Sequence, residues 1–283
     1  MPTPISRNNP KIKQIRALRQ RKVRQGVGLF VVEGIRHVGE ALAAQVAQST
    51  AAHISVEYIC YSPDLLTSEF AIDLVREQTE RGLPCLAVTR EVFASLADKE
   101  NPQGILAVVR PRPMKLSELG PDNFRWGVAL VAPQDPGNIG TILRTIDGVR
   151  ASGLLLLDDP QEGLSSADAY HPNAVRASMG TLFWYPVVIS PFADFAGWAR
   201  QNGYHVYGTS AHGSTDYREV ESYPRPCILL MGSEREGLTP GQVALCQVLI
   251  RMPMRGHATS LNLAVATGVM LYAMLEKPLE NSR

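Results

Sequence analysis

The chain has 283 residues, of which 45% are hydrophobic and 19% charged, and its formal net charge is +1 at pH 7. This is the composition of an ordinary globular protein with one large or two ordinary domains, and the net charge by itself indicates no partner. The sequence has no apolar run of the roughly 18–20 residues that a membrane-spanning helix needs, and no N-terminal apolar core typical of a signal peptide.

Residues of the types that bind metals are scattered along the sequence. The four cysteines include no CxxC pair, and the six histidines show no metal-ligand spacing. The pattern therefore predicts reduced thiols, no metal site and no disulfide framework. Together with the absence of a membrane segment, it favours a cytoplasmic location.

The first 25 residues are strongly basic. They contain eight Lys and Arg residues and no acid, and the first carboxylate in the chain is Glu33. Ile12, Ile15 and Leu18 recur at helical spacing, which predicts a basic amphipathic helix. Such a helix is either a solvated basic face or a docking surface for a polyanion; a membrane is disfavoured because bulky aromatic residues are missing. The candidate RNA-binding residues are Arg16, Arg19, Lys22 and Arg24.

Strand and helix patterns alternate through the rest of the N-terminal half, in segments 28–45, 53–62, 84–96 and 104–113. This alternation predicts an α/β layer with a mostly parallel sheet. The stretch 111–123 has three prolines and polar spacing, so it is the best linker candidate. We therefore predict two domains, residues 1–115 and residues 116–283.

The second half also alternates. Strands are predicted in segments 126–133, 153–159, 185–190, 205–211, 227–234 and 248–254. Helices are predicted in segments 138–149, 171–180, 194–203 and 260–275. The last helix is apolar nearly all round, which is typical of a helix in a core or in a subunit interface.

Three loops that follow strands are rich in small and polar residues: 135–145, 231–239 and 252–262. Open parallel sheets bind ligands outside the carboxyl ends of their strands, so the three loops are candidates for one composite pocket. The first loop has neither the GxGxxG spacing nor a GxxxxGK[ST] motif. It retains a Pro136-Gly137 turn, a helix N-terminus, and Arg144, whose planar guanidinium suits a phosphate or a developing oxyanion.

Each loop taken alone also has a purely structural interpretation. The first is then a turn with an exposed arginine, and Glu234 belongs to an ordinary charged turn. Ser260 and Asn262 would be N-cap residues of the final helix. Gly232, directly after an apolar strand, favours a ligand instead, because glycine there indicates close approach to the backbone.

Together and in this order, the loops resemble the motifs of the SpoU (TrmH-type) RNA ribose methyltransferases of the SPOUT superfamily. The three motif matches are 135–145, 230–239 and 252–266, and 172–180 resembles a further recurring stretch. The N-terminal segments 11–42 and 101–109 resemble the ribosomal-protein-like substrate-binding domain of the rRNA-directed branch. Ile146 and Thr181 depart from the family pattern, which more often has alanine at both positions.

The resemblance implies a C-terminal SPOUT α/β domain with a deep trefoil knot and a smaller N-terminal α/β substrate-binding domain. It also implies a homodimer that binds S-adenosylmethionine and methylates a ribose 2′-hydroxyl of RNA, with ribosomal RNA as the expected substrate. The alternatives are a tRNA ribose methyltransferase and a non-catalytic RNA-binding ribosome factor. The cofactor-binding residues carried over are Gly232, Met252, Met254, Ser260, Leu261 and Asn262.

By the same resemblance, Arg144 is the central catalytic residue. A guanidinium with a pKa above ~12 is a poor base, so we expect Arg144 to bind the adjacent phosphate and stabilise the forming alkoxide. Asn138 would orient the ribose or Arg144, and Glu234 would hold Arg144 or Asn138 in place. Ser260 and Asn262 would brace the pocket.

Overall fold

The computed structural model describes residues 4–48, 53–98 and 100–277, and these form two compact units. The N-terminal unit comprises the chain up to Arg112 together with Tyr170–Trp184. The C-terminal unit comprises Pro113–Ala169 and the chain from Tyr185 onward. Residues 170–184 therefore leave the second half of the sequence and join the first unit, a connection that the predicted domains 1–115 and 116–283 did not include.

The basic N-terminal segment forms two short helices, α1 (Pro10–Ala17) and α2 (Arg21–Val27), in place of the single predicted helix. Ile12, Ile15 and Leu18 lie in the core of the unit, as their spacing predicted. Arg24 is 5% exposed, and its Nη1 donates to the carbonyls of Leu18 and Arg19 at 2.8 Å each. These bonds satisfy acceptors at the end of α1 and stabilise the turn between the helices.

The N-terminal sheet has the order β1-β4-β2-β3. Its strands are β1 (Phe30–Glu33), β2 (Ile54–Tyr61), β3 (Cys85–Ala87) and β4 (Ile105–Pro111). The prediction of a mostly parallel sheet is wrong here, because β4 pairs antiparallel with both β1 and β2, and only β2 and β3 pair in parallel. The helices α3 (Ile35–Gln48) and α4 (Glu69–Glu80) do connect parallel strands, but β4 returns after the short α5 (Arg90–Leu96) in the opposite direction.

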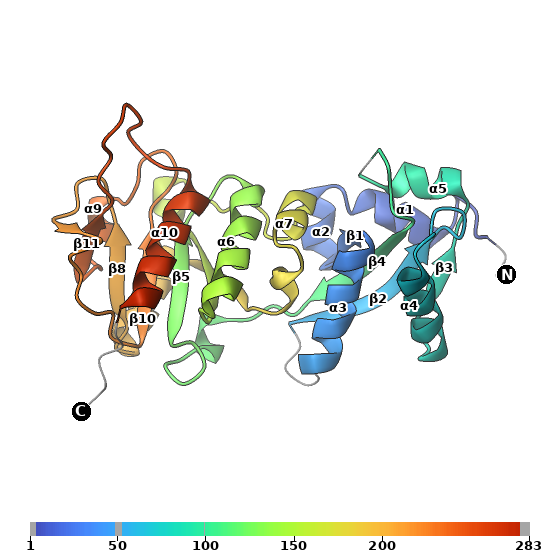
Figure 1. Cartoon of the computed structure of the whole chain (residues 1–283), viewed down its shortest axis with the longest axis horizontal. Helices are drawn as coiled ribbons and strands as arrows, with labels where there is room; N and C mark the ends of the chain where they lie inside the picture. Colours follow the sequence, from blue (N-terminus) through green and yellow to red (C-terminus); the bar gives the residue numbers. More distant parts are fainter. Residues whose placement is uncertain (1–3, 49–52, 99, 278–283) are drawn as a thin grey trace. The chain divides into compact units, whose positions relative to one another are not determined.

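The segment 170–184 contains α7 (Pro172–Ala177) and a 3₁₀ turn, Thr181–Phe183, packed on β1 and α3 (Figure 1). The ring of Phe30 lies 4.7 Å from that of Tyr170 and 6.4 Å from that of Phe183, measured between ring centres. Trp184 Nε1 donates to Glu40 Oε2 at 3.0 Å. Aromatic packing and a hydrogen bond thus fix this segment to the N-terminal unit.

The C-terminal unit is built on a seven-stranded parallel sheet with the order β7-β6-β5-β10-β8-β11-β9. Its strands are β5 (Trp126–Val131), β6 (Gly153–Asp158), β7 (Val187–Pro191), β8 (His205–Thr209), β9 (Thr215–Asp216), β10 (Cys227–Met231) and β11 (Val248–Arg251). The six strands predicted for this half are confirmed, and the two-residue β9 was missed. A parallel α/β unit with a smaller second unit is the fold class that the sequence predicted.

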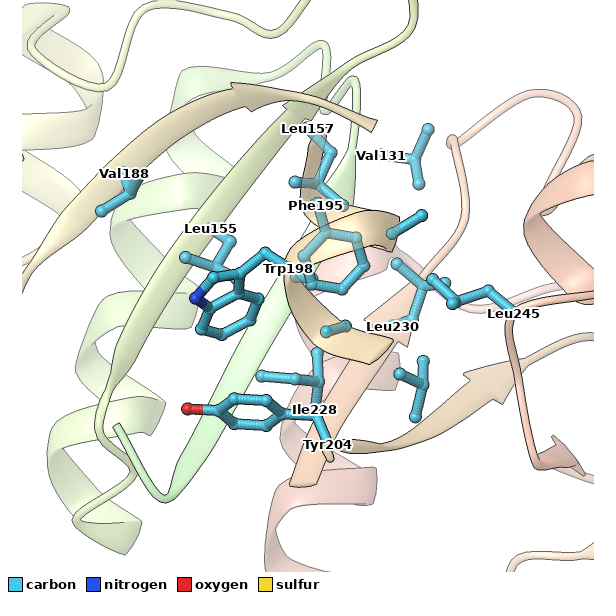
Figure 2. Close-up of a cluster of buried hydrophobic side chains, with 14 of the residues drawn as sticks. Val131, Leu155, Leu157, Val188, Phe195, Trp198, Tyr204, Ile228, Leu230 and Leu245 are labelled. Carbon is cyan, nitrogen blue, oxygen red and sulfur yellow. The ribbon is translucent and has the colours of Figure 1, made fainter. Parts of the chain in front are cut away.

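Helices cover both faces of this sheet, which explains why β5, β6 and β10 are apolar at consecutive positions. On one face α8 (Phe192–Gln201) packs Phe195 and Trp198 against alternate strand residues such as Leu155 and Leu230 (Figure 2). The indole ring of Trp198 stacks on Tyr204 with ring centres 4.4 Å apart. The core of the unit therefore lies between α8 and the central strands.

The other face carries α6 (Pro136–Val149) and α10 (Leu263–Glu276), which pack side by side (Figure 1). Buried residues of α10 include Met270 and Leu271. Its outer side is also apolar, because Val265 and Tyr272 are 52% and 51% exposed. A short helix, α9 (Pro240–Val243), precedes β11. No helix within the described residues has the length and apolarity needed to cross a membrane.

Candidate cofactor pocket

An open pocket of about 700 Å³ lies at the carboxyl ends of β5, β8, β10 and β11. These four strands are neighbours in the sheet, so the loops that follow them meet at one edge. All three loops predicted from the sequence contribute side chains to the pocket. Its volume lies within the ~300–1,000 Å³ range of pockets that take small organic ligands.

A chain of side-chain hydrogen bonds joins the three loops. Asn138 Nδ2 donates to Glu234 Oε1 at 2.6 Å, and Asn262 Nδ2 donates to Asn138 Oδ1 at 3.0 Å. Asn262 Oδ1 in turn accepts the backbone N–H groups of Ala264 at 2.8 Å and Val265 at 3.3 Å. Asn138 is 8% exposed, so both ends of its amide are fixed away from most of the solvent. The structure thus pairs Glu234 with Asn138.

Asn262 is also the N-cap of α10, which is the structural role that the sequence offered as an alternative for this residue. Replacing it with alanine removes the cap and the bond to Asn138, and a lost N-cap costs about 1 kcal/mol of stability. We expect Asn262→Ala to lower the free energy of unfolding by that amount or more, measured by urea denaturation.

Asn262→Asp is the matched variant, because aspartate caps a helix as well as asparagine but has no N–H to donate to Asn138. Its free energy of unfolding should therefore return close to that of the wild type. Wild-type stability in the alanine variant would show that the cap does not contribute to the fold.

Gly232 directly follows β10, lines the pocket and also packs closely against its own loop. A Cβ on Gly232 would lie 2.5 Å from Leu238 N and 2.6 Å from Gly237 O. The close approach is therefore made by the chain's own backbone, where Ser233 and Gly237 exchange hydrogen bonds at 2.9 and 3.0 Å. Gly232 and Gly237 close a tight loop that brings Glu234 to the pocket wall.

The other predicted cofactor residues, Met252, Met254, Ser260, Leu261 and Asn262, all line the pocket. The exposed fractions of Met254 and Leu261 are 37% and 40%. Large apolar side chains open to a pocket can cover an apolar part of a ligand, such as an adenine ring or a thioether chain. Ser260 is exposed, and no hydrogen bond within the described residues joins it to the Asn138–Asn262 chain.

Acidic groups predominate among the charged side chains of the pocket. Among the described residues, Asp135, Glu234 and Glu236 line it together with one cation, Arg235. Asp135 is the N-cap of α6, and its Oδ1 accepts the N–H of Gly137 at 2.8 Å. Its carboxylate already occupies the start of the helix, so this end disfavours a phosphate and the pocket as a whole favours a cationic ligand.

Arg144 lies outside this pocket. It is exposed on α6, and within the described part of the chain neither a hydrogen bond nor an ion pair engages its guanidinium. The structure therefore brings Asn138, Glu234, Ser260 and Asn262 together but leaves Arg144 on an outer surface. Such a group remains available to an anionic partner.

The predicted RNA-binding residues lie in the N-terminal unit. Arg19 and Lys22 are exposed, and Arg16 is half-buried with its Nη2 donating to Ser95 Oγ at 2.9 Å. Arg24 is buried as a helix-capping residue, so its placement makes it structural. The basic surface thus includes Arg16, Arg19 and Lys22 but not Arg24.

The loop after β8 was not predicted as part of the pocket, although Thr209, Ser210 and Ala211 line it. The signal was present in the sequence, because these small residues directly follow an apolar strand, as in the other three loops. Thr209 is 9% exposed, and its hydroxyl donates to Met231 Sδ at 3.4 Å. This contact ties the ends of β8 and β10 together.

The cysteines are free thiols, as the sequence predicted, and two of them, Cys60 and Cys227, are buried. Burial raises the pKa of the Cys60 thiol to about 12, which makes it unreactive at neutral pH. Among the described residues, no group of three or more His, Cys, Asp and Glu side chains could bind a metal ion.

Two family models match the chain. Residues 126–272 match the model of the SpoU rRNA Methylase family, and residues 9–107 match the MRM3-like substrate binding domain. The first range contains all the pocket residues described above. The second ends at β4, close to the division between the two units.

Individual relatives match over nearly the whole chain. The 23S rRNA (guanosine(2553)-2′-O)-methyltransferase RlmP of Bacillus subtilis is 28% identical, over 94% of this chain and 96% of its own length. The 23S rRNA (uridine(2479)-2′-O)-methyltransferase of Streptomyces viridochromogenes is 31% identical, over 95% and 90%. The crystal structure of an AdoMet-bound rRNA methyltransferase from Sinorhizobium meliloti is 33% identical and superposes with a TM-score of 0.81, covering 95% of each chain.

Proposed function

Because this chain belongs to the SpoU rRNA methylase family, we propose that its pocket binds S-adenosylmethionine and that its N-terminal unit presents ribosomal RNA for methylation of a ribose 2′-hydroxyl. The chain is an S-adenosylmethionine-dependent RNA 2′-O-methyltransferase. The observation that carries the assignment is the meeting of three family motifs in one pocket at the edge of a parallel sheet.

The residues of the pocket fit the cofactor. Bound S-adenosylmethionine supplies an activated methyl group on a positively charged sulfonium. Asp135, Glu234 and Glu236 give the pocket the charge that favours such a cation, while Met252 and Leu261 offer apolar walls for its adenosyl part. Small residues at the strand ends, among them Gly232, leave backbone groups accessible for hydrogen bonds.

The polar chain Glu234–Asn138–Asn262 supports a positioning role in the reaction. Glu234 accepts a hydrogen bond from Asn138, and Asn262 donates one to Asn138, so the Asn138 amide is oriented before RNA binds. We propose that Asn138 positions the target ribose and that Glu234 and Asn262 fix Asn138. Preorganised polar groups lower the barrier because they need not reorient during the reaction.

We propose that Arg144 contacts the RNA phosphate beside the target ribose and stabilises the 2′-alkoxide as the proton leaves. Its exposure on α6 and its lack of a carboxylate partner in the described residues support a role toward an incoming anion. Guanidinium groups bind phosphates with two parallel hydrogen bonds and remain charged throughout.

The apolar outer side of α10 supports the proposal of a homodimer. Val265, Val269, Tyr272 and Leu275 are between 37% and 52% exposed on a helix whose inner side packs on α6. Contiguous exposed apolar side chains are typical of protein interfaces. Arg144 lies on the neighbouring helix, so a dimer formed here would bring it near the partner subunit.

We further propose a deep trefoil knot in the C-terminal unit and a cytoplasmic location. The free thiols and the rRNA substrate support the location.

The direct test of function is methyl transfer. The full chain is incubated with S-adenosylmethionine carrying a labelled methyl group and with total RNA, and the ribose-methylated positions are mapped. We expect label in the 23S or 16S fraction, at one or a few nucleotides. Label confined to tRNA would replace the rRNA assignment, and a chain that binds no S-adenosylmethionine would overturn the enzyme assignment.

We propose that residues 1–115 form an RNA substrate-binding domain and that its basic helices contact the RNA. The match to a substrate-binding model supports this role. Reversing the charges of Arg16 and Arg19 to glutamate should weaken RNA binding at least about tenfold and flatten its salt dependence. The measurement is filter binding of 23S rRNA at several salt concentrations.

The matched control reverses Arg76 and Arg81, which are also exposed but form ion pairs with Asp73 and Glu77 on α4. This control should bind RNA nearly as well as the wild type. If the Arg16 and Arg19 variant keeps the wild-type affinity and salt slope, the basic helices are only a solvated face.

A further inference from the structure

A second cleft, of about 370 Å³, lies within the N-terminal unit. It is lined by Arg19, Ala97 and Asp98 on one side and by His171, Pro172 and Asn173 on the other. A smaller cavity of about 50 Å³ shares Arg19, Asp98 and Pro172 with it and has mainly apolar walls. The cleft is thus lined by charged and polar side chains together with Ala97 and Pro172, and its volume exceeds the ~300 Å³ lower limit of ligand pockets.

Arg19, which lines the cleft, and Arg16, three residues before it in the sequence, are both held by neutral acceptors. Arg19 Nη2 donates to the carbonyls of Leu96 at 3.2 Å and Ala97 at 2.7 Å. Arg16 donates to Ser95 Oγ at 2.9 Å and to the Arg7 carbonyl at 3.3 Å. All these acceptors are neutral. A guanidinium oriented by neutral groups keeps its full attraction for a phosphate and loses less entropy on binding it.

Three other exposed arginines of the same unit differ in this respect. Arg76, Arg81 and Arg110 each form an ion pair with a carboxylate, at 2.8, 2.6 and 2.7 Å. Pairing with an acid offsets their charge toward a third group. Within the described residues, the hydrogen-bond acceptors of Arg16 and Arg19 include no such carboxylate, so their charge is not offset in this way.

The α7 side of the cleft offers hydrogen bonds and flat surfaces. His171 Nδ1 accepts the N–H of Asn173 at 3.2 Å, so the neutral imidazole carries its proton on Nε2 as a donor. The carboxylate of Asp98 forms an ion pair with Arg176 at 2.6 Å, which limits its repulsion of an anion. An imidazole ring and a proline ring are surfaces on which a nucleobase can stack.

From this arrangement we propose that the cleft binds one unpaired nucleotide of the RNA substrate. Its phosphate lies on Arg19, and its base packs against His171 and Pro172. The inference rests on the proposed function for the presence of RNA, but it assigns a new site. That site is composite, because α7 lies in the range matched by the methylase model while the arginines lie in the range matched by the substrate-binding model.

Two variants on the α7 side test the site without removing any arginine. His171→Asn deletes the ring but keeps a side chain that caps a helix well. Asn173→Glu places a carboxylate at an exposed position of the cleft. The probes are 23S rRNA and a fluorescein-labelled single-stranded 12-mer RNA, with affinity measured by anisotropy for the 12-mer and by filter binding for the rRNA. The full chain is used throughout.

We expect Asn173→Glu to weaken binding of both RNAs about tenfold or more, and His171→Asn to weaken it about threefold to tenfold, as stacking contacts do. His171→Asn should leave the salt slope unchanged, because it removes no charge. The control is Gln201→Glu at the exposed end of α8, which changes net charge equally and should bind as the wild type does.

The outcomes separate this site from the proposed function. Wild-type affinity in both α7 variants overturns the cleft, even if the protein methylates rRNA. If Gln201→Glu also lowers RNA affinity, the effect of Asn173→Glu is explained by net charge alone, and the proposed cleft is overturned. If the wild type binds RNA through the cleft but transfers no methyl group, the cleft stands and the enzymatic proposal fails. Equal S-adenosylmethionine affinity in all variants confirms that the fold of the C-terminal unit is intact.

Discussion

Replacing Arg144 with alanine is expected to lower kcat for RNA methylation by about 10²–10³-fold, the usual loss when one group that stabilises a developing oxyanion is removed. Arg144 lies outside the pocket, so the affinity for S-adenosylmethionine should stay within about twofold of the wild type. Because the side chain is exposed on α6, the free energy of unfolding should change by less than about 0.5 kcal/mol. Single-turnover methyl transfer, cofactor titration and urea denaturation measure the three quantities.

Two further variants sharpen this result. Arg144→Lys keeps the positive charge but not the planar pair of donors, so it should recover only part of the rate. Arg200→Ala removes an exposed arginine from α8 on the opposite face of the sheet and should leave the rate unchanged. Near-normal turnover in Arg144→Ala would rule out a catalytic role for Arg144, which would then be only an exposed residue of α6.

Gly232→Ala should strongly weaken cofactor binding. Its Cβ would lie 2.5 Å from Leu238 N and 2.6 Å from Gly237 O, and these are backbone atoms that cannot move without opening the loop. Displacement of this loop carries Glu234 away from Asn138 and removes one pocket wall. We expect at least a ~100-fold loss of S-adenosylmethionine affinity, about 2.8 kcal/mol, measured by calorimetric titration.

Gly197→Ala is the matched control, since a Cβ at this position of α8 has no atom within 4 Å. Replacing an exposed helical glycine with alanine stabilises a protein by up to about 1 kcal/mol. This variant should therefore bind the cofactor normally and unfold at a slightly higher urea concentration. Normal cofactor affinity in Gly232→Ala would mean that the loop tolerates rearrangement and does not form the pocket wall.

Local patterns in the sequence predict the C-terminal unit well. Its strands are buried on both faces, which produces consecutive apolar residues such as those of β6, and parallel strands necessarily bring their following loops to one edge. The pocket could therefore be assembled from three loops before any coordinates were known. The loop after β8 was missed because Thr209 and Ser210 have no distinctive chemistry.

Other features depend on long-range pairing, which residue patterns do not encode. The direction of β4 is set by its insertion between β1 and β2, not by the alternation of strands and helices. Likewise, eight basic residues predict a charged surface but do not reveal that Arg24 turns inward to cap α1. The hydrogen bonds that hold Arg19 on the end of α5 also join residues 77 and 78 positions apart.

The excursion of residues 170–184 into the N-terminal unit has a consequence for the order in which the protein forms. A ribosome releases the chain from its N-terminus, and domains generally fold as they emerge. Phe30 packs against Tyr170 and Phe183, and Glu40 accepts a hydrogen bond from Trp184, which lies 144 positions later in the sequence. These contacts can form only after most of the chain has been made. The first unit to be synthesised therefore stays incomplete until β5 and β6, the first two strands of the second unit, have been translated.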